Sequence, residues 1–586
     1  MAQWMVAAKK ADFRGIGERF GIDQVTARIL RNRGLLADDE IRSFLFGGMS
    51  DLNDAHLLKD GERLAKILAG KIRENKSIRI IGDYDIDGVM ASYILNKALL
   101  RCGAKVSVAI PDRVKDGYGL NVHLIEQALS AGADTIVTCD NGIAALDEIA
   151  YAKKQGMTVL VTDHHSVPFV EEGGQKRFLK SEADAVVNPH QIECAYPYKE
   201  LCGAAVAWKV VLLLYEALHV PAGEAEDFIE QVAFATVGDV MPLTGENRIL
   251  VKEGLKRIHR TANLGMRALI AQCGIEAQDI DCYHIGFVLG PCINAVGRLD
   301  TAQQALALLL AEDAGTAAEL AAKLVMKNNE RREQTDRGVE EAKRLVASGG
   351  YAKDAVLVLY LPDVHESIAG IIAGRIRECY YRPTYVLTRA ENGVKGSGRS
   401  VEEYSMYEQL CRCSSLLTRF GGHPMAAGLS LPEANIDALR RQLNELCPFR
   451  AEELAEKIHI DVPMPVDYVT MELVRQFRLL APFGKDNPKP LFADRNLSVS
   501  RMWMIGKKRN VLRLSLMSEH GSPVPGIYFG DCEAFVSYLQ ERFGTAAVDA
   551  ALRGRENAIR LSIVYAPKIN VFRGEETLQL EIQAYR

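Results

Sequence analysis

Short apolar runs alternate with helical stretches between residues 77 and 188, and this alternation constrains the fold more than any other feature. The runs SIRIIG, KVSVAI, DTIVT, TVLVT and DAVVN have the length and β-branched content of buried strands. The stretches between them, such as SYILNKALLRCG and HLIEQALSAG, have helical spacing. Strands that alternate with helices in this way predict a doubly wound parallel sheet in an α/β protein.

The rest of the 586 residues divides by pattern into further parts. We expect residues 1–45 to form a helical arm without chemistry of its own, and residues 46–330 to hold the parallel sheet and a largely helical segment. Residues 331–455 predict a connecting helix, solvated and charged over 326–346, and then a second α/β unit. Short strands separated by Gly and Pro turns in residues 456–586 predict a small β-barrel.

Composition excludes several protein classes. With 48% hydrophobic and 25% charged residues, the chain is neither disordered nor collagen-like. The net charge of −5 conceals an asymmetry, because residues 485–586 hold 15 Lys and Arg against 11 Asp and Glu, a net +4 beside −9 elsewhere. The 12 cysteines form no CxxC pair, which favours reduced thiols over a disulfide framework or a zinc site. No apolar segment indicates secretion or membrane insertion, so we expect a cytoplasmic protein.

Carboxylates and histidines follow four apolar runs that we interpret as strands. The set comprises Asp83, Asp85 and Asp87 after SIRII, Asp140 after DTIVT, Asp163, His164 and His165 after TVLVT, and Asp239 after QVAFATV. Carboxyl ends of parallel strands open into one crevice, where this many carboxylates would repel one another unless cations neutralised them. Oxygen ligands with one or two imidazoles suit Mn²⁺ or Mg²⁺, and the excess of Asp favours two ions about 3.5–4 Å apart, an arrangement that activates water for in-line displacement at phosphorus. Taken singly, each Asp is equally well explained as a turn residue or a helix cap.

The ordered series DYDIDG (83–88), DNG (140–142), DHH (163–165) and GDVMPL (238–243) resembles the DHH phosphoesterase superfamily. Within it, the chain is similar to the RecJ exonucleases, which degrade single-stranded DNA from 5′ to 3′. The likeness continues through PDRVKDGYGL (111–120), GPCINAVGRLD (290–300), GSGRS (396–400), FGGHPMAAG (420–428) and PFGKDNPKP (482–490). The resemblance implies a metal-dependent exodeoxyribonuclease that releases 5′-mononucleotides and acts in DNA repair and recombination.

Individual roles follow from the resemblance. It implies a catalytic set of Asp85, Asp87, Asp140, His164, His165 and Asp239. All of these except His165 are expected to bind the two Mn²⁺ or Mg²⁺ ions, with Asp83 as a further ligand and His165 as a metal or phosphate contact. The chain departs from the family at Ile81, where a His is frequent, and at Cys292, where an Arg is frequent. The first departure favours Asp83 as the local substitute, and the second removes one candidate phosphate contact.

The second α/β unit resembles the DHH-associated domain, which holds the nucleic-acid backbone over the metals. The expected substrate-binding residues are Arg113, Tyr118, Arg298, Ser397, Gly398, Arg399, Gly422 and His423. We interpret KGSGRS as a loop whose glycines admit a phosphate to the backbone N–H groups and whose arginine binds it in a bidentate pair, or else as a plain solvent loop. Similarly, His423 either lies near the cleft or is a structural residue of a turn. Tyr118 either stacks on a base or packs within the protein. The small residues of SIAGIIAGRIRE are expected to allow close helix packing. Arg113 and Arg298 are expected in loops, with Arg113 and Arg399 at the terminal 5′-phosphate.

The barrel combines basic and aromatic residues in the mixture that single strands require. They are Arg501, Lys507, Lys508, Arg509, Arg513, Arg560, Lys568 and Arg573 with Trp503, Tyr528, Phe529 and Phe572. The resemblance implies an OB-fold, although each aromatic alone is better explained as core. We expect a monomer that binds single-stranded DNA and no membrane, and a single-strand-binding protein and a DNA helicase are further candidate partners. The alternatives are a DHH phosphodiesterase of short oligoribonucleotides or cyclic dinucleotides, and a catalytically dead DHH scaffold. The barrel and the full set of ligands favour the exonuclease.

Overall fold

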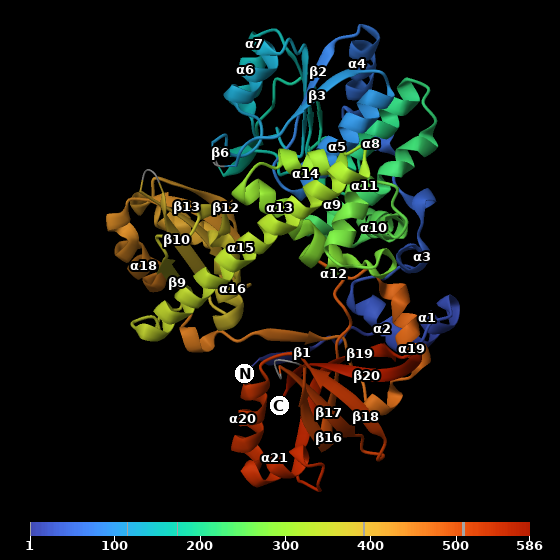
Figure 1. Ribbon diagram of the computed structural model, residues 1–586, viewed down its shortest axis with the longest axis vertical. Coiled ribbons are helices and arrows are strands. Elements are labelled where there is room, and N and C mark those ends of the chain that lie inside the picture. The colour runs from blue at the N-terminus through green and yellow to red at the C-terminus, as the bar shows by residue number, and fades with distance from the viewer. Residues whose placement is uncertain (1, 114, 173, 391–392, 507–509) are drawn as a thin grey trace. The chain divides into compact units, whose positions relative to one another are not determined.

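Figure 1 shows the computed structural model, which describes residues 2–113, 115–172, 174–390, 393–506 and 510–586. The chain forms two compact units. The first comprises Leu52–Met241 and Ile249–Glu456, and the second comprises Ala2–Asp51, Pro242–Arg248 and Lys457–Arg586. Within the described residues, no helix has both the length and the apolar character needed to cross a membrane.

A five-stranded parallel sheet begins the first unit, with the strand order β3-β2-β4-β5-β8. Its strands are β2 (Ser77–Ile81), β3 (Lys105–Ala109), β4 (Thr135–Cys139), β5 (Thr158–Thr162) and β8 (Ala185–Val187). The helices around it are α4 (Gly61–Arg73), α5 (Ile86–Arg101), α6 (Val122–Ser130), α7 (Leu146–Lys154) and α8 (Gly203–Ala217), and a hairpin of β6 (Phe169–Glu172) and β7 (Gln175–Phe178) follows β5.

Alternation along the strands explains why helices cover both faces of this sheet. Ile81, Ile136 and Val159 point to one face, where they pack with buried residues of α6 and α7. Residues of the opposite parity face α5 and α8, which contact the strands and are apolar on almost every side. The predicted doubly wound parallel sheet is therefore confirmed.

Helices make up the segment that follows. They are α9 (Ile229–Gly238), α10 (Gly245–Ile258), α11 (Leu264–Gln272), α12 (Cys282–His284), a π-helical turn (Ile285–Leu289), α13 (Gly290–Leu299), α14 (Gln303–Leu309) and α15 (Ala314–Ser348). The predicted connecting helix exists, but it begins 12 residues before 326 and buries a stripe of small residues against its neighbours. The boundary that we placed between residues 330 and 331 falls inside this continuous helix.

A second, mixed sheet has the order β12-β13-β11-β10-β9. Its elements are β9 (Leu357–Tyr360), α16 (Glu366–Tyr380), β10 (Thr384–Ala390), β11 (Gly393–Arg399), α17 (Met406–Arg412), β12 (Arg419–His423), β13 (Ala426–Leu431) and α18 (Ile436–Glu445). Strands β9 and β10 are parallel, and the other pairs are antiparallel. One face packs on α15 and α16 around Val386 and Ile372, and the other packs on α17 and α18 around Tyr385 and Leu439.

The second unit contains a closed barrel, because β16 pairs with β17, β17 with β18, β18 with β20, β20 with β19, and β19 again with β16. These strands are β16 (Phe492–Ile505), β17 (Val511–Met517), β18 (Pro523–Tyr528), β19 (Arg560–Phe572) and β20 (Glu575–Tyr585), preceded by β14 (Lys457–Ile460), β15 (Val462–Pro463) and α19 (Met471–Gln476). The predicted OB-like barrel is confirmed. The sequence reasoning missed α20 (Cys532–Phe543) and α21 (Thr545–Leu552) between β18 and β19.

The N-terminal arm belongs to the barrel unit. It comprises β1 (Gln3–Val6), α1 (Phe13–Phe20), α2 (Gln24–Asn32) and α3 (Asp38–Phe46). Strand β1 pairs in parallel with β14, and the buried residues Ile29 and Leu30 share one core with Phe492 and Leu514 of the barrel. Both ends of the chain therefore build this unit.

Candidate metal and phosphate sites

The first motif turns tightly from strand β2 into helix α5. Asp85 is the N-cap of α5, and its carboxylate accepts hydrogen bonds from the backbone N–H groups of Asp87 (3.0 Å) and Gly88 (3.1 Å). Gly88 is required here, because a Cβ at this position would lie 2.5 Å from the carbonyl oxygen of Asp83. The turn places three carboxylates at the carboxyl end of β2.

Asp87 is fully buried in the first turn of α5. Its carboxylate accepts hydrogen bonds from the N–H groups of Gly203 (2.6 Å) and Ala204 (2.7 Å) at the start of α8. Burial and the neighbouring Asp85 raise the pKa of Asp87, and His164 and the two N–H groups oppose that rise. The first N–H groups of a helix have no partner within the helix, and here two of them hold the Asp87 carboxylate in place.

Asp140 follows strand β4 in a left-handed backbone conformation with a φ of 61°. The hydroxyl of Tyr118 donates a hydrogen bond to its carbonyl oxygen at 2.8 Å, and Asn141 ties the loop to the sheet by donating to the carbonyl oxygens of Ile81 and Cys139. Tyr118 is half exposed, and its hydroxyl is held by this hydrogen bond. Stacking of its ring on a base stays a prediction.

The DHH motif divides its three residues between two tasks. Asp163 turns away from the carboxylates, and its side chain accepts hydrogen bonds from the N–H groups of Ile143 (2.8 Å), His164 (2.7 Å) and His165 (3.0 Å). The Nδ1 atom of His165 lies 2.7 Å from the same carboxylate. Burial alone would lower the pKa of His165, but the hydrogen bond and the charge of Asp163, with Asp239 and Asp87, raise it to about 9.

His164 faces the carboxylates. Its Nε2 atom lies 3.1 Å from Asp140 Oδ1, 3.6 Å from Asp87 Oδ2 and 3.8 Å from Asp239 Oδ2. We predicted a strand before Asp239, and this was wrong, because Asp239 caps the end of helix α9. A completely buried helix is apolar on every side, so its sequence cannot be distinguished from that of a buried strand.

All six predicted metal ligands come together. Three overlapping groups have ligand atoms within 4.8 Å of one another: Asp83 with Asp85 and Asp140, Asp87 with His164 and Asp239, and Asp140 with His164 and His165. Asp140 is shared, so the arrangement offers two adjacent cation positions. His165 lies beside them on the exposed side.

The charge balance of this cluster is unfavourable without a cation. Burial and then Asp85 raise the pKa of Asp83, while burial and then Asp87 raise that of Asp140. Both oxygens of Asp83 and Oδ1 of Asp140 are buried and form no hydrogen bond within the described residues. Buried carboxylate oxygens without donors, aimed at a common centre with an imidazole, fit hard divalent cations.

Four arginines gather beside this cluster. Arg298 is partly buried at the end of α13, where its guanidinium donates to the carbonyl oxygen of Ser367 at 2.7 Å. Burial, and then Arg113, Arg331 and Arg399, lower the pKa of Arg298 to about 10. Within the described residues, none of these four guanidinium groups forms an ion pair with a carboxylate. Mutual repulsion of this kind is relieved by an anion.

Aromatic and hydroxyl groups complete this arginine group. The guanidinium carbon of Arg113 lies 4.7 Å from the ring centre of Tyr84, and Tyr84 meets the ring of Tyr118 edge to face at 6.3 Å. Arg399 donates to the hydroxyl of Ser397 at 3.1 Å. Tyr84 and Arg113 also line a pocket with Lys395, Gly428 and the start of α16.

The structure corrects two sequence interpretations of these residues. Arg298 lies on a helix rather than in a loop, and KGSGRS forms the inner strand β11 rather than a loop. Its backbone N–H groups therefore face neighbouring strands. Gly398 is buried, and a Cβ there would lie 2.6 Å from the sulfur of Met406. Packing thus accounts for this glycine. The close packing expected of SIAGIIAGRIRE is present, because a Cβ on Gly370 would lie 2.7 Å from Ser397 Oγ on β11, and a Cβ on Gly338 of α15 would lie 2.4 Å from Ile372 of this helix.

Gly422 and His423 lie on the edge strand β12, where both are exposed. Gly422 has a φ of 142°, and a Cβ there would lie 2.4 Å from the carbonyl oxygen of Ala426, so the hairpin requires glycine. Within the described residues, no contact joins His423 to the carboxylates.

The two family departures lie in different surroundings. Ile81 packs in the apolar core between the sheet and α6, and Asp83 enters the cluster together with Asp85 and Asp87. Cys292 is buried on α13, and the amide of Asn328 donates to its sulfur at 3.4 Å. The same Asn328 accepts from the Arg331 guanidinium at 2.8 Å, so an arginine from α15 reaches this region.

Sequence reasoning missed Asp163 as an anchor of the DHH loop, Tyr84, and Arg331. Asp163 has the same side chain as the aspartate ligands, but its carboxylate points toward backbone N–H groups of its own loop and of Ile143. Tyr84 stands inside the DYDIDG motif, so its position beside the carboxylates was a usable signal. Arg331 lies in a run of charges on a long helix, which gives no local signal.

The barrel presents basic and aromatic side chains in pairs. Trp503 lies between Arg501 and Arg513, whose guanidinium carbons are 5.4 and 5.7 Å from its ring centre. Lys568 Nζ lies 5.1 Å from the ring of Phe529, which is half exposed. Tyr528 instead packs against Phe535 and Tyr585 in the core. Lys507, Lys508 and Arg509 lie outside the described residues.

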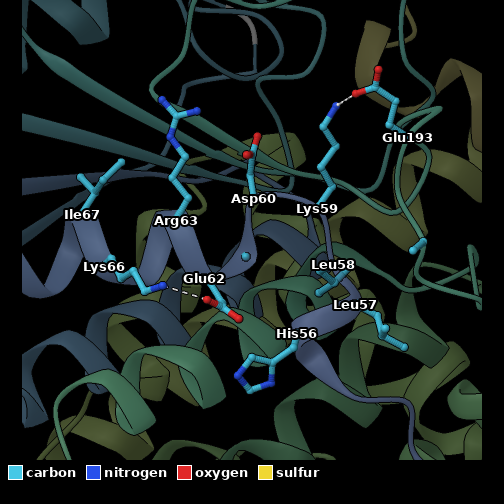
Figure 2. Close-up of a pocket in the computed structure, with 12 residues that line it drawn as sticks. His56, Leu57, Leu58, Lys59, Asp60, Glu62, Arg63, Lys66, Ile67 and Glu193 are labelled. Carbon is cyan, nitrogen blue, oxygen red and sulfur yellow. Dashed lines mark hydrogen bonds and ion pairs between the residues drawn. The ribbon is translucent and has the colours of Figure 1, made fainter.

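A separate hollow lies at the start of α4 (Figure 2). Two ion pairs lie at this hollow, with Lys59 Nζ 2.7 Å from Glu193 Oε2 and Lys66 Nζ 2.8 Å from Glu62 Oε2. The residues that line it include His56 and Arg63 but none of the predicted site residues. The carboxylate cluster and this hollow are therefore different places.

Three family models match the chain. Residues 77–236 match the DHH family N-terminal domain, residues 353–447 match the DHHA1 domain, and residues 460–584 match the RecJ OB domain. These ranges correspond to the parallel sheet, the mixed sheet and the barrel.

Known proteins resemble the whole chain. The single-stranded-DNA-specific exonuclease RecJ of Escherichia coli is 31% identical, and the match covers 95% of this chain and 94% of that protein. The protein of the same name from Bacillus subtilis is 33% identical over 88% of this chain, which spans 64% of its length. The crystal structure of RecJ with Mn²⁺ from Thermus thermophilus matches with a TM-score of 0.80 and 26% identity, over all of this chain and 79% of that one. The chain belongs to the RecJ family.

Proposed function

We propose that this chain is an exonuclease specific for single-stranded DNA, which it degrades from the 5′ end to mononucleotides with the help of two Mn²⁺ or Mg²⁺ ions. The observation that carries the proposal is the cluster of five carboxylates and His164, in which buried oxygens of Asp83 and Asp140 form no hydrogen bond within the described residues. Family membership supports the substrate class, and the Mn²⁺ in the Thermus RecJ crystal structure supports the cofactor.

The residues that would hold the ions are Asp83, Asp85, Asp87, Asp140, His164 and Asp239. Divalent ions at such sites supply Lewis acidity, which polarises water and stabilises negative charge that develops at phosphorus. Asp163 holds the two histidines in place, and the N-terminus of α8 holds Asp87. His165 lies beside the cluster, with its Nδ1 atom 3.9 Å from Asp140 Oδ1, and its imidazole can contact a phosphate oxygen.

The arginine group is the proposed grip for the terminal 5′-phosphate. Arg113, Arg298 and Arg399 repel one another, and a phosphate would relieve this repulsion while accepting charge-assisted hydrogen bonds. Tyr84 contacts Arg113 of this group with its ring. It also precedes Asp85 of the carboxylate cluster in the chain. A grip beside the metals would set the direction of degradation.

The barrel is the proposed binding surface for the rest of the strand. Trp503 and Phe529 combine ring surface with adjacent cations, which suits bases and phosphates of a single strand. A monomeric state, a cytoplasmic location, and binding to a single-strand-binding protein or a DNA helicase stay predictions.

The decisive experiment compares substrates. Release of nucleotides in Mn²⁺ is measured side by side on 5′-labelled single-stranded DNA, the matching duplex, RNA and a cyclic dinucleotide. We expect rapid release from single-stranded DNA alone. Preferred cleavage of the cyclic dinucleotide or of short RNA would favour the other DHH activity, and no cleavage of any substrate would favour a scaffold.

The grip is tested with strands that end in 5′-phosphate or 5′-hydroxyl. Charge-assisted contacts of about 1.5–3 kcal/mol predict a preference of roughly 10- to 150-fold for the phosphate at limiting substrate. Arg399→Ala should reduce the preference and Arg399→Lys should restore part of it, because Lys lacks the planar fork. The exposed Arg389 on β10 provides the control variant Arg389→Ala. Equal rates on both ends, or equal attack at 3′ ends, would exclude the grip.

A further inference from the structure

Two cysteines lie in contact beside the arginine group. The sulfur atoms of Cys273 and Cys292 are 4.0 Å apart, and both residues are free thiols. A disulfide requires about 2.05 Å between sulfurs, so the two atoms must approach by about 2 Å.

The two partners differ in mobility and access. Cys273 is partly exposed at the C-terminal end of α11, directly before Gly274, which has a left-handed φ of 68°. Cys292 is buried on α13, where its thiol donates to the carbonyl oxygen of Val288 at 3.3 Å and its sulfur accepts from Asn328. Cys273 can therefore meet a small oxidant from solvent, whereas Cys292 is covered by its neighbours.

Helix α13 connects this thiol pair to both proposed sites. Asn294, two residues after Cys292, accepts a hydrogen bond from the N–H of Ile86 in the first motif at 2.9 Å. Arg298, at the end of the same helix, donates to Ser367. Asn328 links the Cys292 sulfur to the Arg331 guanidinium. The Cys292 sulfur and Arg331, a member of the arginine group, therefore share Asn328 as a hydrogen-bond partner.

We propose that Cys273 and Cys292 form a reversible intramolecular disulfide on exposure to a peroxide, and that this disulfide weakens the binding of DNA at the arginine group. The effect on DNA binding, and the slower degradation of DNA that we expect from it, rest on the proposed function. The formation of the disulfide does not.

The reaction balances with hydrogen peroxide as the oxidant. The Cys273 thiolate attacks one peroxide oxygen, so that an S–O bond forms, the O–O bond breaks and one water leaves after protonation. The Cys292 thiol then attacks the sulfenic sulfur, an S–S bond forms, the S–O bond breaks and the second water leaves with the thiol proton. Two thiols and one peroxide give one disulfide and two waters. A dithiol reverses the step by exchange.

The order of attack agrees with the electrostatics. The hydrogen bond with Cys292 lowers the pKa of Cys273, while that bond and burial raise the pKa of Cys292. The more accessible thiol is thus also the more readily ionised one, which makes it the first to react. In the disulfide, the Cys292 sulfur turns toward Cys273 and away from Asn328, so Asn328 loses a partner that helps it hold Arg331.

The test uses the full-length protein, treated with hydrogen peroxide in a metal chelator and then alkylated and mapped by peptide mass. We expect a 273–292 cross-link with the loss of two hydrogens, about 2 Da, which a dithiol reverses. Cys273→Ser and Cys292→Ser should abolish the cross-link. Cys379→Ser, which removes an exposed cysteine elsewhere, should leave it unchanged. Thiols that stay free to alkylate, or that link to other cysteines, would overturn the proposal.

The functional half is read on 5′-phosphorylated single-stranded DNA, in Mn²⁺ added after the peroxide is removed. We expect oxidation to weaken binding and slow degradation at limiting DNA by about tenfold, equivalent to about 1.4 kcal/mol. Cys273→Ser should be as active as the reduced wild type and should not respond to peroxide. A cross-linked protein with unchanged DNA binding would overturn this half. A reduced protein that degrades no DNA would instead contradict the proposed function and leave the cross-link result standing.

Discussion

Replacing Asp163 with alanine tests whether the DHH loop depends on a residue that is not itself a ligand. The Asp163 carboxylate accepts hydrogen bonds from the backbone N–H groups of Ile143, His164 and His165 and contacts the His165 ring. Asp163→Ala removes all four interactions and leaves the six ligand side chains in place. We expect a loss of both stability and metal affinity.

The magnitude follows from the number of donors left without a partner. A buried donor without an acceptor costs about 1–3 kcal/mol, so three backbone N–H groups cost roughly 3–9 kcal/mol. Water can reach the loop beside His165, whose side chain is 45% exposed, so we expect a value near the lower end, roughly 3–5 kcal/mol. Asp163→Asn keeps one acceptor oxygen and should lose less.

The pH dependence gives this prediction a second, independent readout. Burial would raise the pKa of Asp163, but the hydrogen bonds and charge of His165 and the backbone N–H groups lower it overall. Its contribution to stability is therefore present above the unfolded pKa of about 3.9 and is lost as the pH falls through the lower folded value. His165, with a folded pKa of about 9, contributes below its unfolded pKa of about 6.5, and this contribution is lost as the pH rises to 9.

The assay is urea unfolding in a metal chelator at several pH values, together with calorimetric titration of Mn²⁺. The difference in unfolding free energy between wild type and Asp163→Ala should be greatest between about pH 4 and 6.5 and should shrink toward pH 9. Asp279→Ala, at an exposed carboxylate of the same unit, is the control. A difference within about 0.5 kcal/mol, or one that grows from pH 6.5 to 9, would refute the reasoning.

Three further predictions concern separate parts of the protein. His164→Ala should lower nuclease turnover in saturating Mn²⁺ at least about a thousandfold, and retention of more than a tenth would exclude a ligand role. The double variant Arg501→Ala, Arg513→Ala should lower the magnitude of the slope of log affinity against log salt by about 0.7 for each phosphate that is no longer neutralised. Fluorescence anisotropy on single-stranded DNA measures this slope, and an unchanged slope would exclude this face of the barrel from the DNA path. Gly88→Ala should destabilise the first unit by about 1–3 kcal/mol in thermal unfolding, because its Cβ would meet the backbone of Asp83, and an unchanged midpoint would contradict that packing.

The sequence predicted the clustering of the carboxylates and His164 well because its signal is local. A carboxylate directly after a buried parallel strand reaches the same edge as its counterparts, whatever the rest of the fold does. Asp83, Asp140 and His164 follow this rule. Asp239 also belongs to the cluster, but our reason for placing it there was wrong, because a buried helix and not a strand precedes it.

The remaining errors involve information that a local pattern does not contain. We interpreted Gly398 as part of a loop, because glycine and serine dominate KGSGRS. In the structure it lies in a strand, and the side chains of Met406 and Tyr385 leave no room for a Cβ at this position. Asp163 and Asp140 have the same side chain, and only the backbone direction makes one an anchor and the other a cluster member. The pairing of β1 with β14 joins residues more than 450 positions apart, which one sequence cannot reveal.

That pairing has a consequence for synthesis of the protein. The barrel core needs Ile29 and Leu30, but its strands are translated only after the whole first unit has left the ribosome. Roughly 400 residues separate the two parts, which takes about 20–80 s at 5–20 residues per second. During this interval the amphipathic helices of the arm wait with their apolar faces uncovered. The first unit can fold as it emerges, whereas the barrel unit becomes complete only after residues 457–586 have been synthesised, so the nascent arm needs protection from aggregation during that time.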